Sequence, residues 1–129
     1  MGFLIVFLGG GIGAALRHGV NLTSARLLGT AFPYHTMFEN VSGSFVMGLL
    51  AGYFAFRGSA TQHWQLFFTT GILGGYTTFS TYAVQTEQLL SGHPLIAAVY
   101  LIGTALFALL AVQTGVVVTR RLMLPRRED

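Results

Sequence analysis

Four long apolar segments occupy most of the chain and constrain its fold more than any other feature. They cover about residues 2–20, 34–56, 64–90 and 95–119. A bilayer core about 30 Å thick needs about 20 apolar residues per helix, and each segment approaches that length. The short connections carry the glycines, prolines and arginines that commonly end helices. The sequence therefore predicts one all-α membrane domain over residues 1–129, with four transmembrane helices.

The composition points to the same class of protein. Hydrophobic residues make up 53% of the chain, charged residues only 9%, and the mean hydropathy is +0.64. So few charged side chains cannot give a core of this size a water-facing surface. A soluble enzyme or a nucleic-acid-binding protein does not fit, so we expect membrane lipid and no nucleic acid as a partner. The chain has no cysteine, which rules out disulfides and thiol chemistry.

Both ends of the chain carry membrane signals. The first apolar segment has no basic region before it and no small-residue cleavage motif after it, so we interpret it as a retained span and not as a signal peptide. Near the other end lies a basic cluster, which is typical of a solvated tail that contacts lipid headgroups. The cluster consists of Arg120, Arg121, Arg126 and Arg127.

Small residues recur at helical spacing within the apolar segments. Three glycine pairs have the GxxxG spacing that lets membrane helices approach closely: Gly9 with Gly13, Gly48 with Gly52, and Gly71 with Gly75. A ridge of small and polar residues at successive i+4 positions follows one side of the second segment: Asn40, Ser44, Gly48 and Gly52. The ridge fits either helix packing or a polar pathway. Because four short helices enclose little space, we expect such a pathway to need a dimer.

The middle of the third segment is rich in glycine, threonine and serine, and it fits two structures. Adjacent Gly74 and Gly75 are poor helix formers, so residues 74–78 could unwind. Unwound backbone at membrane depth is tolerated where it is buried in protein or lines a wet cavity, and its carbonyls could hold a cation. The alternative is a tightly packed helix whose hydroxyls bond to their own backbone.

Three motifs resemble those of the small bacterial fluoride channels of the Fluc (CrcB) family. They are residues 10–17 (GGIGAALR), 36–45 (TMFENVSGSF) and 74–82 (GGYTTFSTY), of which the last is the most specific. The length and the four-segment layout also match, and the fourth segment matches loosely through Tyr100 and Thr104.

This resemblance implies a multi-pass channel of the plasma (inner) membrane, not an enzyme, that lets cytoplasmic fluoride leave passively and so lowers its toxicity. It implies an antiparallel, dual-topology dimer, in which the partner is an inverted second copy of the chain or an inverted paralogue. It also implies a broken third helix and a structural sodium ion at the dimer centre. The backbone carbonyls of Gly74 and Thr77 would bind that sodium ion.

The matched motifs imply the pore residues as well. They are Asn40, Phe79, Ser80, Thr81 and Tyr82, with Tyr100 and Thr104 from the fourth helix, and Arg17 near an aqueous entrance. Neutral amide and hydroxyl donors can replace the hydration shell of a small anion without holding it too tightly. Phe79 and Tyr82, three residues apart, could present positive ring edges to the anion, although this spacing is also typical of core packing.

Three residues depart from the family pattern. Gln85 stands where an acidic residue is usual, Tyr82 replaces a phenylalanine, and Glu39 replaces a small apolar residue beside Asn40. A carboxylate next to an anion route is unexpected, and Glu39 could be protonated, paired with an arginine, or facing an aqueous vestibule. The alternative function is a small proton-coupled secondary transporter in which Glu39 or Glu87 carries the protons.

Overall fold

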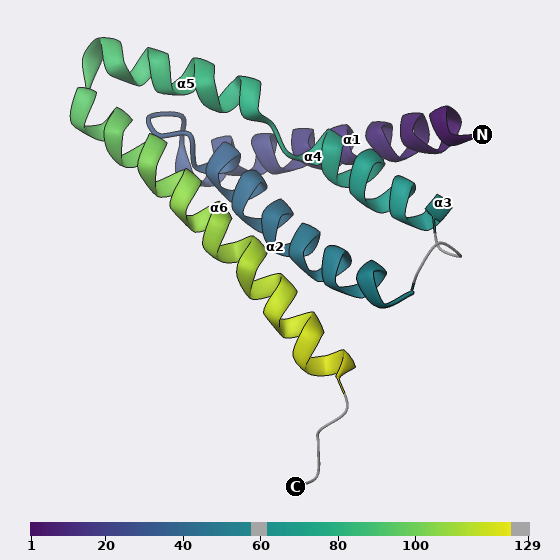
Figure 1. The fold of residues 1–129 in the computed structure, drawn as a ribbon. Coiled ribbons are helices and arrows are strands. Elements are labelled where there is room, and N and C mark those ends of the chain that lie inside the picture. Colours follow the sequence, from purple (N-terminus) through teal and green to yellow (C-terminus); the bar gives the residue numbers. More distant parts are fainter. Residues whose placement is uncertain (58–61, 125–129) are drawn as a thin grey trace, which may run out of the picture.

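A computed structural model describes residues 1–57 and 62–124, and this part of the chain is helical without any strand. Three long helices are separated by turns and by one segment built from shorter pieces (Figure 1). The basic residues Arg126 and Arg127, assigned above to a headgroup-contacting tail, lie outside the described residues. The elements in chain order are α1 (Gly2–Leu28), α2 (Tyr34–Arg57), α3 (Gln62–Gln65), the π-helical η2 (Leu66–Leu73), α4 (Gly74–Tyr76), α5 (Phe79–Gly92) and α6 (Pro94–Met123).

The first helix is longer than the sequence predicted. It continues to Leu28, whereas the apolar pattern placed its end near Val20. The polar residues that follow the apolar stretch do not end the helix, and within it the Thr23 hydroxyl donates to the Gly19 carbonyl at 2.8 Å. The helix ends at Gly29, whose φ of 77° is a conformation that glycine adopts without steric cost. Hydropathy marked the end of the apolar stretch and not the end of the helix.

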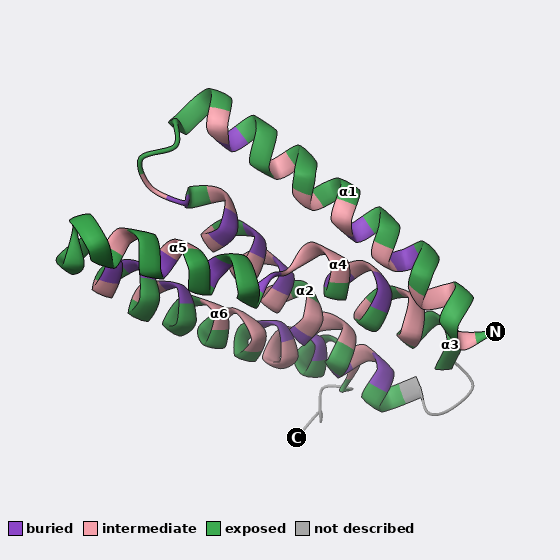
Figure 2. Ribbon diagram, turned by 90° about the horizontal axis from the view of Figure 1, so that it is seen from above, coloured by how far each residue is buried: buried purple, intermediate pink, exposed green. Residues whose placement is uncertain are grey.

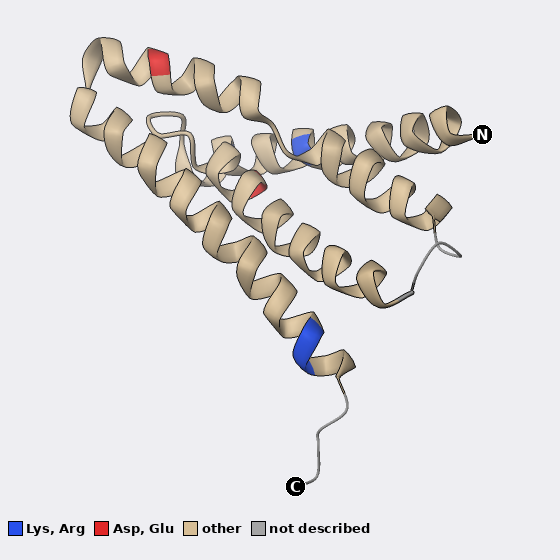
Figure 3. Cartoon of the chain, viewed as in Figure 1, with Lys and Arg blue, Asp and Glu red and all other residues tan. Residues whose placement is uncertain are grey.

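The outer faces of the helices are apolar and exposed. Figure 2 shows exposed residues along the outward sides of α1 and α6, and among them Phe3 is 95% and Leu95 78% exposed. Among the described helices, α1 and α6 are each long and apolar enough to cross a membrane by length and composition. Charged residues are sparse, with acidic positions on α2 and α5 and basic positions on α1 and near the end of α6 (Figure 3). Such a surface suits lipid better than water.

Glycines bring α2 and α6 into backbone contact. The two helices run side by side (Figure 1), and a Cβ atom added at Gly48 would collide with the Val112 carbonyl of α6. Gly115 of α6 has the reciprocal relation to the Phe45 carbonyl, and a Cβ at Gly52 would lie 2.7 Å from the Cβ of Thr119. The close approach predicted from the glycine spacing is confirmed for this pair of helices.

Helix α1 is packed in the same way against η2 and α4. A Cβ added at Gly9 would lie 2.9 Å from the Cα of Gly71, and one at Gly71 would lie 3.0 Å from the Cα of Gly9. A Cβ atom added at Gly13 would collide with the Ile72 carbonyl, and one added at Gly75 would collide with the Gly10 carbonyl of α1. The glycine pairs of the first and third segments therefore contact each other, and they hold the backbone of residues 66–76 against α1.

The helical run of residues 62–76 is followed by two extended residues. Thr77 has φ −81° and ψ 156°, and Thr78 has φ −151° and ψ 118°. Helix α5 begins again at the next residue, with the Thr78 hydroxyl accepting the Thr81 N–H at 3.2 Å as an N-cap. The hydroxyls of Thr69 and Thr77 also bond to carbonyls of their own helix, at 2.6 and 2.9 Å. The predicted unwinding of residues 74–78 is therefore wrong for residues 74–76, which are helical, and it holds only for Thr77 and Thr78. The alternative, in which hydroxyls bond to their own helix, describes the residues before this break.

Candidate functional site

Two cavities meet at the extended residues. Thr78 lines both of them. The polar cavity, of about 290 Å³, lies between α1, α2 and the start of α5, and its lining residues are Ala14, Arg17, His18, Asn21, His35, Thr36, Glu39, Thr78 and Thr81. The apolar groove, of about 520 Å³, lies between α2, α5 and α6, and its lining residues are Asn40, Gly43, Ser44, Met47, Leu73, Thr77, Thr78, Phe79, Tyr82, Thr104, Ala105, Ala108, Leu109 and Val112.

The structure brings most of the predicted site residues to these two cavities. Of the predicted pore residues, four line the apolar groove: Asn40, Phe79, Tyr82 and Thr104. Thr81 and Arg17 line the polar cavity. The ridge on α2 divides accordingly, since Asn40 and Ser44 face the groove while the glycines below them contact α6.

Two predicted pore residues lie elsewhere. Ser80 is exposed, and its hydroxyl lies 3.4 Å from the Thr78 hydroxyl outside both sets of lining residues. Tyr100 is completely buried and lines neither cavity. Its hydroxyl donates to the Gln85 side-chain oxygen at 2.9 Å, so Tyr100 ties α6 to α5 behind the groove. Gln85 in turn lies 3.2 Å from the His35 ring nitrogen of α2.

Asn40 braces the extended residues through both ends of its amide. Its Oδ1 accepts the Thr78 N–H at 2.9 Å, and its Nδ2 donates to the Thr78 carbonyl at 3.0 Å. A primary amide has two N–H groups, so one N–H of Asn40 is left on the groove side for another acceptor. The sequence suggested Asn40 only as a donor to an anion, and the structure adds this second role.

These side-chain bonds release two backbone carbonyls. In an uninterrupted helix the Thr78 N–H would donate to the Gly74 carbonyl, and the Thr81 N–H to the Thr77 carbonyl. Instead the Thr78 N–H donates to Asn40 and the Thr81 N–H to the Thr78 hydroxyl. The carbonyls of Gly74 and Thr77 therefore lack their usual helical donors. Carbonyl oxygens without helical donors can be ligands for a cation, and of these two residues only Thr77 has extended backbone, whereas Gly74 is helical.

The aromatic residues of the groove differ in their surroundings. Phe79 is 79% exposed, whereas Tyr82 is buried, and their ring centroids lie 5.8 Å apart. The Tyr82 hydroxyl donates to the Leu101 carbonyl of α6, and its ring lies 5.3 Å from that of Tyr100. The hydroxyl that replaces a family phenylalanine is therefore accommodated by the backbone of α6.

Three residues that line the cavities carry a buried polar atom without a hydrogen-bond partner among the described residues. Two of these atoms belong to the polar cavity: the Oε1 of Glu39, a residue only 1% exposed, and the hydroxyl of Thr36. The third is the hydroxyl of Thr104 on the apolar groove. Buried polar groups normally have partners, so these atoms indicate positions for a ligand or water. Glu87, the other acid named in the transporter alternative, is exposed on α5 and lines neither cavity.

Sequence reasoning missed five of the polar residues that line the polar cavity. They are His18, Asn21, His35, Thr36 and Thr78. A usable signal was present, because Arg17 and Asn21 are four residues apart on α1 and His35 and Glu39 four apart on α2. Each pair shares a helix face. The spacing alone did not indicate that this face of α1 and this face of α2 line the same cavity.

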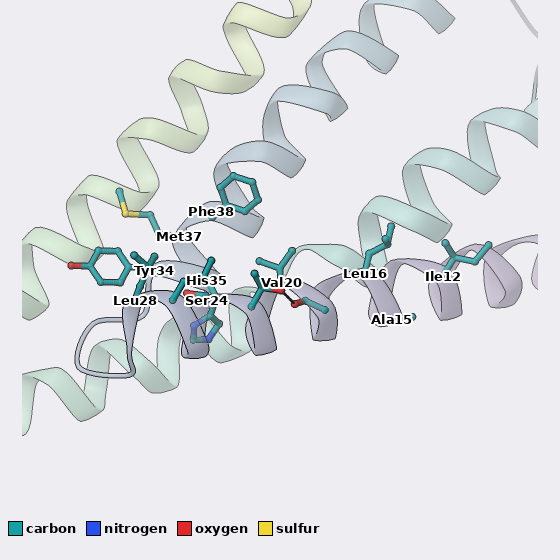
Figure 4. Close-up of a pocket in the computed structure, with 13 residues that line it drawn as sticks. Ile12, Ala15, Leu16, Val20, Ser24, Leu28, Tyr34, His35, Met37 and Phe38 are labelled. Atoms are coloured by element: carbon teal, nitrogen blue, oxygen red, sulfur yellow. Dashed lines mark hydrogen bonds between the residues drawn. The ribbon is translucent and has the colours of Figure 1, made fainter.

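A groove larger than either cavity adjoins the polar cavity, with which it shares His35. It has a volume of about 1010 Å³ and is formed by α1 and the start of α2 (Figure 4). Its lining is mainly apolar, including Ile12, Leu16, Val20 and Phe38, and it contains none of the predicted pore residues. Its chemistry is that of a surface for lipid or for another apolar helix, not of an ion pathway.

Comparisons with known proteins point to one family. The family model described as "CrcB-like protein, Camphor Resistance (CrcB)" matches residues 4–116. A protein of Rhodopseudomonas palustris (strain BisB5), named fluoride-specific ion channel FluC, is 53% identical over 93% of this chain and 98% of its own length. Similar proteins of Nitrobacter hamburgensis (FluC 2; 52% identity, 95% of this chain and 99% of the relative) and Methylobacterium nodulans (FluC; 50%, 92% and 95%) have the same channel name. Because the family model and these relatives cover nearly the whole chain, the chain belongs to the family of CrcB-like proteins.

Proposed function

We propose that the chain is a fluoride-selective anion channel that lets cytoplasmic fluoride leave the cell passively and so lowers its toxicity. The observation that carries the proposal is the identity of about half of all residues, over more than nine-tenths of the chain, with relatives named fluoride-specific ion channels. A channel of this kind is a membrane protein and not an enzyme.

The donors at the two cavities suit a small, strongly hydrated anion. The spare N–H of Asn40 and the unpartnered hydroxyl of Thr104 face the apolar groove, and Thr81 places a hydroxyl at the polar cavity. These groups are neutral, so they compensate lost hydration without trapping the ion as a fixed cation would. Arg17, the one arginine lining the polar cavity, can raise the local anion concentration at the entrance.

The helices fit a protein that crosses the plasma (inner) membrane four times. Helices α1 and α6 support two crossings by length and apolar composition. We assign the other two to α2 and to the segment from α3 to α5, in which the two extended residues would form the break of the third transmembrane helix. The exposed apolar side chains of the outer faces would then contact lipid.

The proposed channel is completed by a second, inverted copy of the chain or by an inverted paralogue. Support comes from the apolar groove, where Phe79 is largely exposed in the single chain although it lies beside the pore residues. A ring in this position needs a cover to form one wall of an enclosed path. An antiparallel partner would supply that cover.

A structural sodium ion would be held by the carbonyls of Gly74 and Thr77, which lack helical donors. A bound cation supplies positive charge that compensates carbonyl oxygens left without hydrogen bonds. Replacing sodium by a larger monovalent cation in the buffer should lower the thermal stability of the purified dimer. If the thermal stability of the dimer is the same in both cations, the proposed sodium site is contradicted.

The decisive experiment is efflux of fluoride from liposomes that hold the purified protein. Fluoride should leave the liposomes when a potassium ionophore supplies the counter-current. Chloride should stay inside under the same conditions. Equal chloride flux, or no flux of either ion, would contradict the channel proposal. A proton gradient should not be needed.

The cellular role follows from acid chemistry. Hydrogen fluoride crosses membranes as a neutral molecule and ionises in a near-neutral cytoplasm, where the anion is trapped. A negative-inside potential drives the anion outward through a passive channel by about 2.3 kcal/mol per charge at about 100 mV. Deleting the gene should therefore make cells sensitive to fluoride mainly at acidic external pH, as measured by growth.

A further inference from the structure

The polar cavity contains a buried acid that the proposed pore does not use. Glu39 directly precedes the pore residue Asn40, but it faces the other cavity, so the two side chains lie on either side of Thr78. Its Oε1 has no hydrogen-bond partner among the described residues, although the side chain is almost completely buried. Glu39 thus lines the cavity that an anion would cross on its way to Thr78.

The groups around Glu39 do not neutralise it by direct contact. Helix α1 contributes Arg17 and His18 to the cavity, and α2 contributes His35. Helix α6 places Tyr100 nearby, and the residues at the start of α5 offer only the hydroxyls of Thr78 and Thr81. Within residues 1–57 and 62–124, no ion pair joins Arg17 to Glu39.

A buried carboxylate without an ion pair is costly in a membrane protein, whereas a neutral carboxyl is not. The neutral form also has a different chemistry, because a protonated carboxyl has one O–H donor and an ionised carboxylate has only acceptors. The protonation state of Glu39 therefore decides whether the polar cavity offers an anion a donor or a repelling charge.

We propose that the polar cavity is a fluoride-binding entrance site in which the neutral carboxyl of Glu39 donates a hydrogen bond to the anion. This inference rests on the proposed channel function and adds a regulation to it. Arg17 attracts the anion, and the Glu39 O–H and the Thr81 hydroxyl hold it beside Thr78. Ionised Glu39 repels the anion and offsets the charge of Arg17, so occupancy of the site falls.

No proton is transported in this scheme. The proton stays on Glu39 while the anion binds, moves on to the apolar groove and leaves, so one negative charge crosses per fluoride ion. The scheme thus differs from a proton-coupled transporter, in which the proton would cross with the substrate. Its consequence is a channel that conducts best in acid, where uptake of the neutral acid is fastest.

The test is voltage-driven fluoride efflux from liposomes at a series of pH values from about 6 to about 8.5, with equal pH on both sides. Flux through protein-free liposomes is subtracted at each pH. The wild-type flux should fall with rising pH, by about tenfold per pH unit once Glu39 is mostly ionised, because a single group titrates. Glu39→Gln, which keeps a neutral N–H donor, should conduct at all pH values without this decline.

Two further variants separate the causes. Glu39→Leu, neutral but without a donor, should lose the pH dependence and conduct less than Glu39→Gln. Glu87→Gln is the matched control, because Glu87 is exposed on α5 and lines neither cavity; it should keep the wild-type pH profile. Size-exclusion chromatography checks that each variant assembles like the wild type.

The outcomes are distinguishable. If wild-type flux does not change with pH, or if the decline persists in Glu39→Gln, then Glu39 is not the controlling group. Flux in Glu39→Leu equal to that in Glu39→Gln would overturn the donor role. Absence of fluoride flux from the wild type at every pH would instead contradict the channel function itself.

Discussion

The contact between α2 and α6 and the extended residues Thr77 and Thr78 are built by opposite means. Along α2 and α6, glycine backbones touch with no room for a side chain, and the helical hydrogen bonds stay intact. At Thr77 and Thr78 the helical bonds are lost, and side chains of Asn40 and Thr78 replace them. The first region depends on glycines that have no side chain, and the second depends on particular side-chain atoms that form hydrogen bonds. The first should therefore tolerate no added volume, and the second no lost hydrogen-bond group.

The largest effect is expected from added volume in the α2–α6 contact. Gly48→Leu places a side chain where the Val112 carbonyl lies, and neither backbone can yield without separating the helices. Overpacking of this kind costs about 1–3 kcal/mol or more even in adaptable cores. The variant should fail to yield a folded protein, as measured by size-exclusion chromatography and thermal unfolding in detergent.

Gly19→Ala is the matched control for that experiment. A Cβ at Gly19 on α1 would have no neighbour within 4 Å, and alanine favours a helix by about 1 kcal/mol over glycine. It should fold as well as the wild type. A well-folded, conducting Gly48→Leu protein would show that the α2–α6 distance is not fixed by the glycines.

The next effect is expected at the extended residues. Asn40→Ala removes both hydrogen bonds to Thr78, which are worth about 0.5–1.5 kcal/mol each, and also the spare donor on the groove. Fluoride flux should be abolished while the dimer still assembles, because the packing glycines are untouched. Efflux from liposomes and size-exclusion chromatography measure the two properties separately.

Asn40→Asp sharpens this result. The aspartate can still accept the Thr78 N–H, but it loses the donor to the Thr78 carbonyl and adds a negative charge beside the proposed anion path. Repulsion is strong across a medium of low dielectric constant, so flux should again be lost. Normal flux in a correctly assembled Asn40→Asp protein would remove Asn40 from the pore.

A smaller but still clear loss is expected for Phe79→Ile. The change removes the aromatic ring at the edge of the apolar groove and replaces it by an apolar side chain of roughly similar bulk. Because Phe79 is 79% exposed in the single chain, its substitution should hardly change the stability of the fold. Permeation should be blocked if the positive ring edge contacts the anion, and unchanged flux would reduce Phe79 to a packing role.

The positions of most helices could be predicted from the sequence, because apolar length and glycine spacing act locally. The second and fourth predicted segments differ from α2 and α6 by a few residues. The end of α1 could not be predicted in this way, because the polar residues after Val20 are as compatible with a continuing helix as with its end.

The candidate site was less accessible to sequence reasoning. The residue types at positions 77–82 indicated hydroxyl groups and aromatic rings near the site. They could not indicate that Asn40 bonds to Thr78, because these two residues are 38 positions apart. The position of Tyr100 was also not predictable, since its hydroxyl is bonded to Gln85 and the residue is buried behind the groove. Contacts of this kind depend on how α2, α5 and α6 pack, which no local pattern encodes.

The smallest effect is expected for Tyr82→Phe. This change keeps the buried ring of the groove and removes only the hydroxyl that donates to the Leu101 carbonyl. That carbonyl lies within α6 and has its own helical donor, so the loss is one additional hydrogen bond, worth about 1 kcal/mol, and the melting temperature should fall by a few degrees. Fluoride flux should stay close to that of the wild type and well above that of Phe79→Ile. If Tyr82→Phe were instead the crippled variant while still folded, the phenol would be a donor to the anion, and the ring-edge explanation for Phe79 and Tyr82 would have to be abandoned.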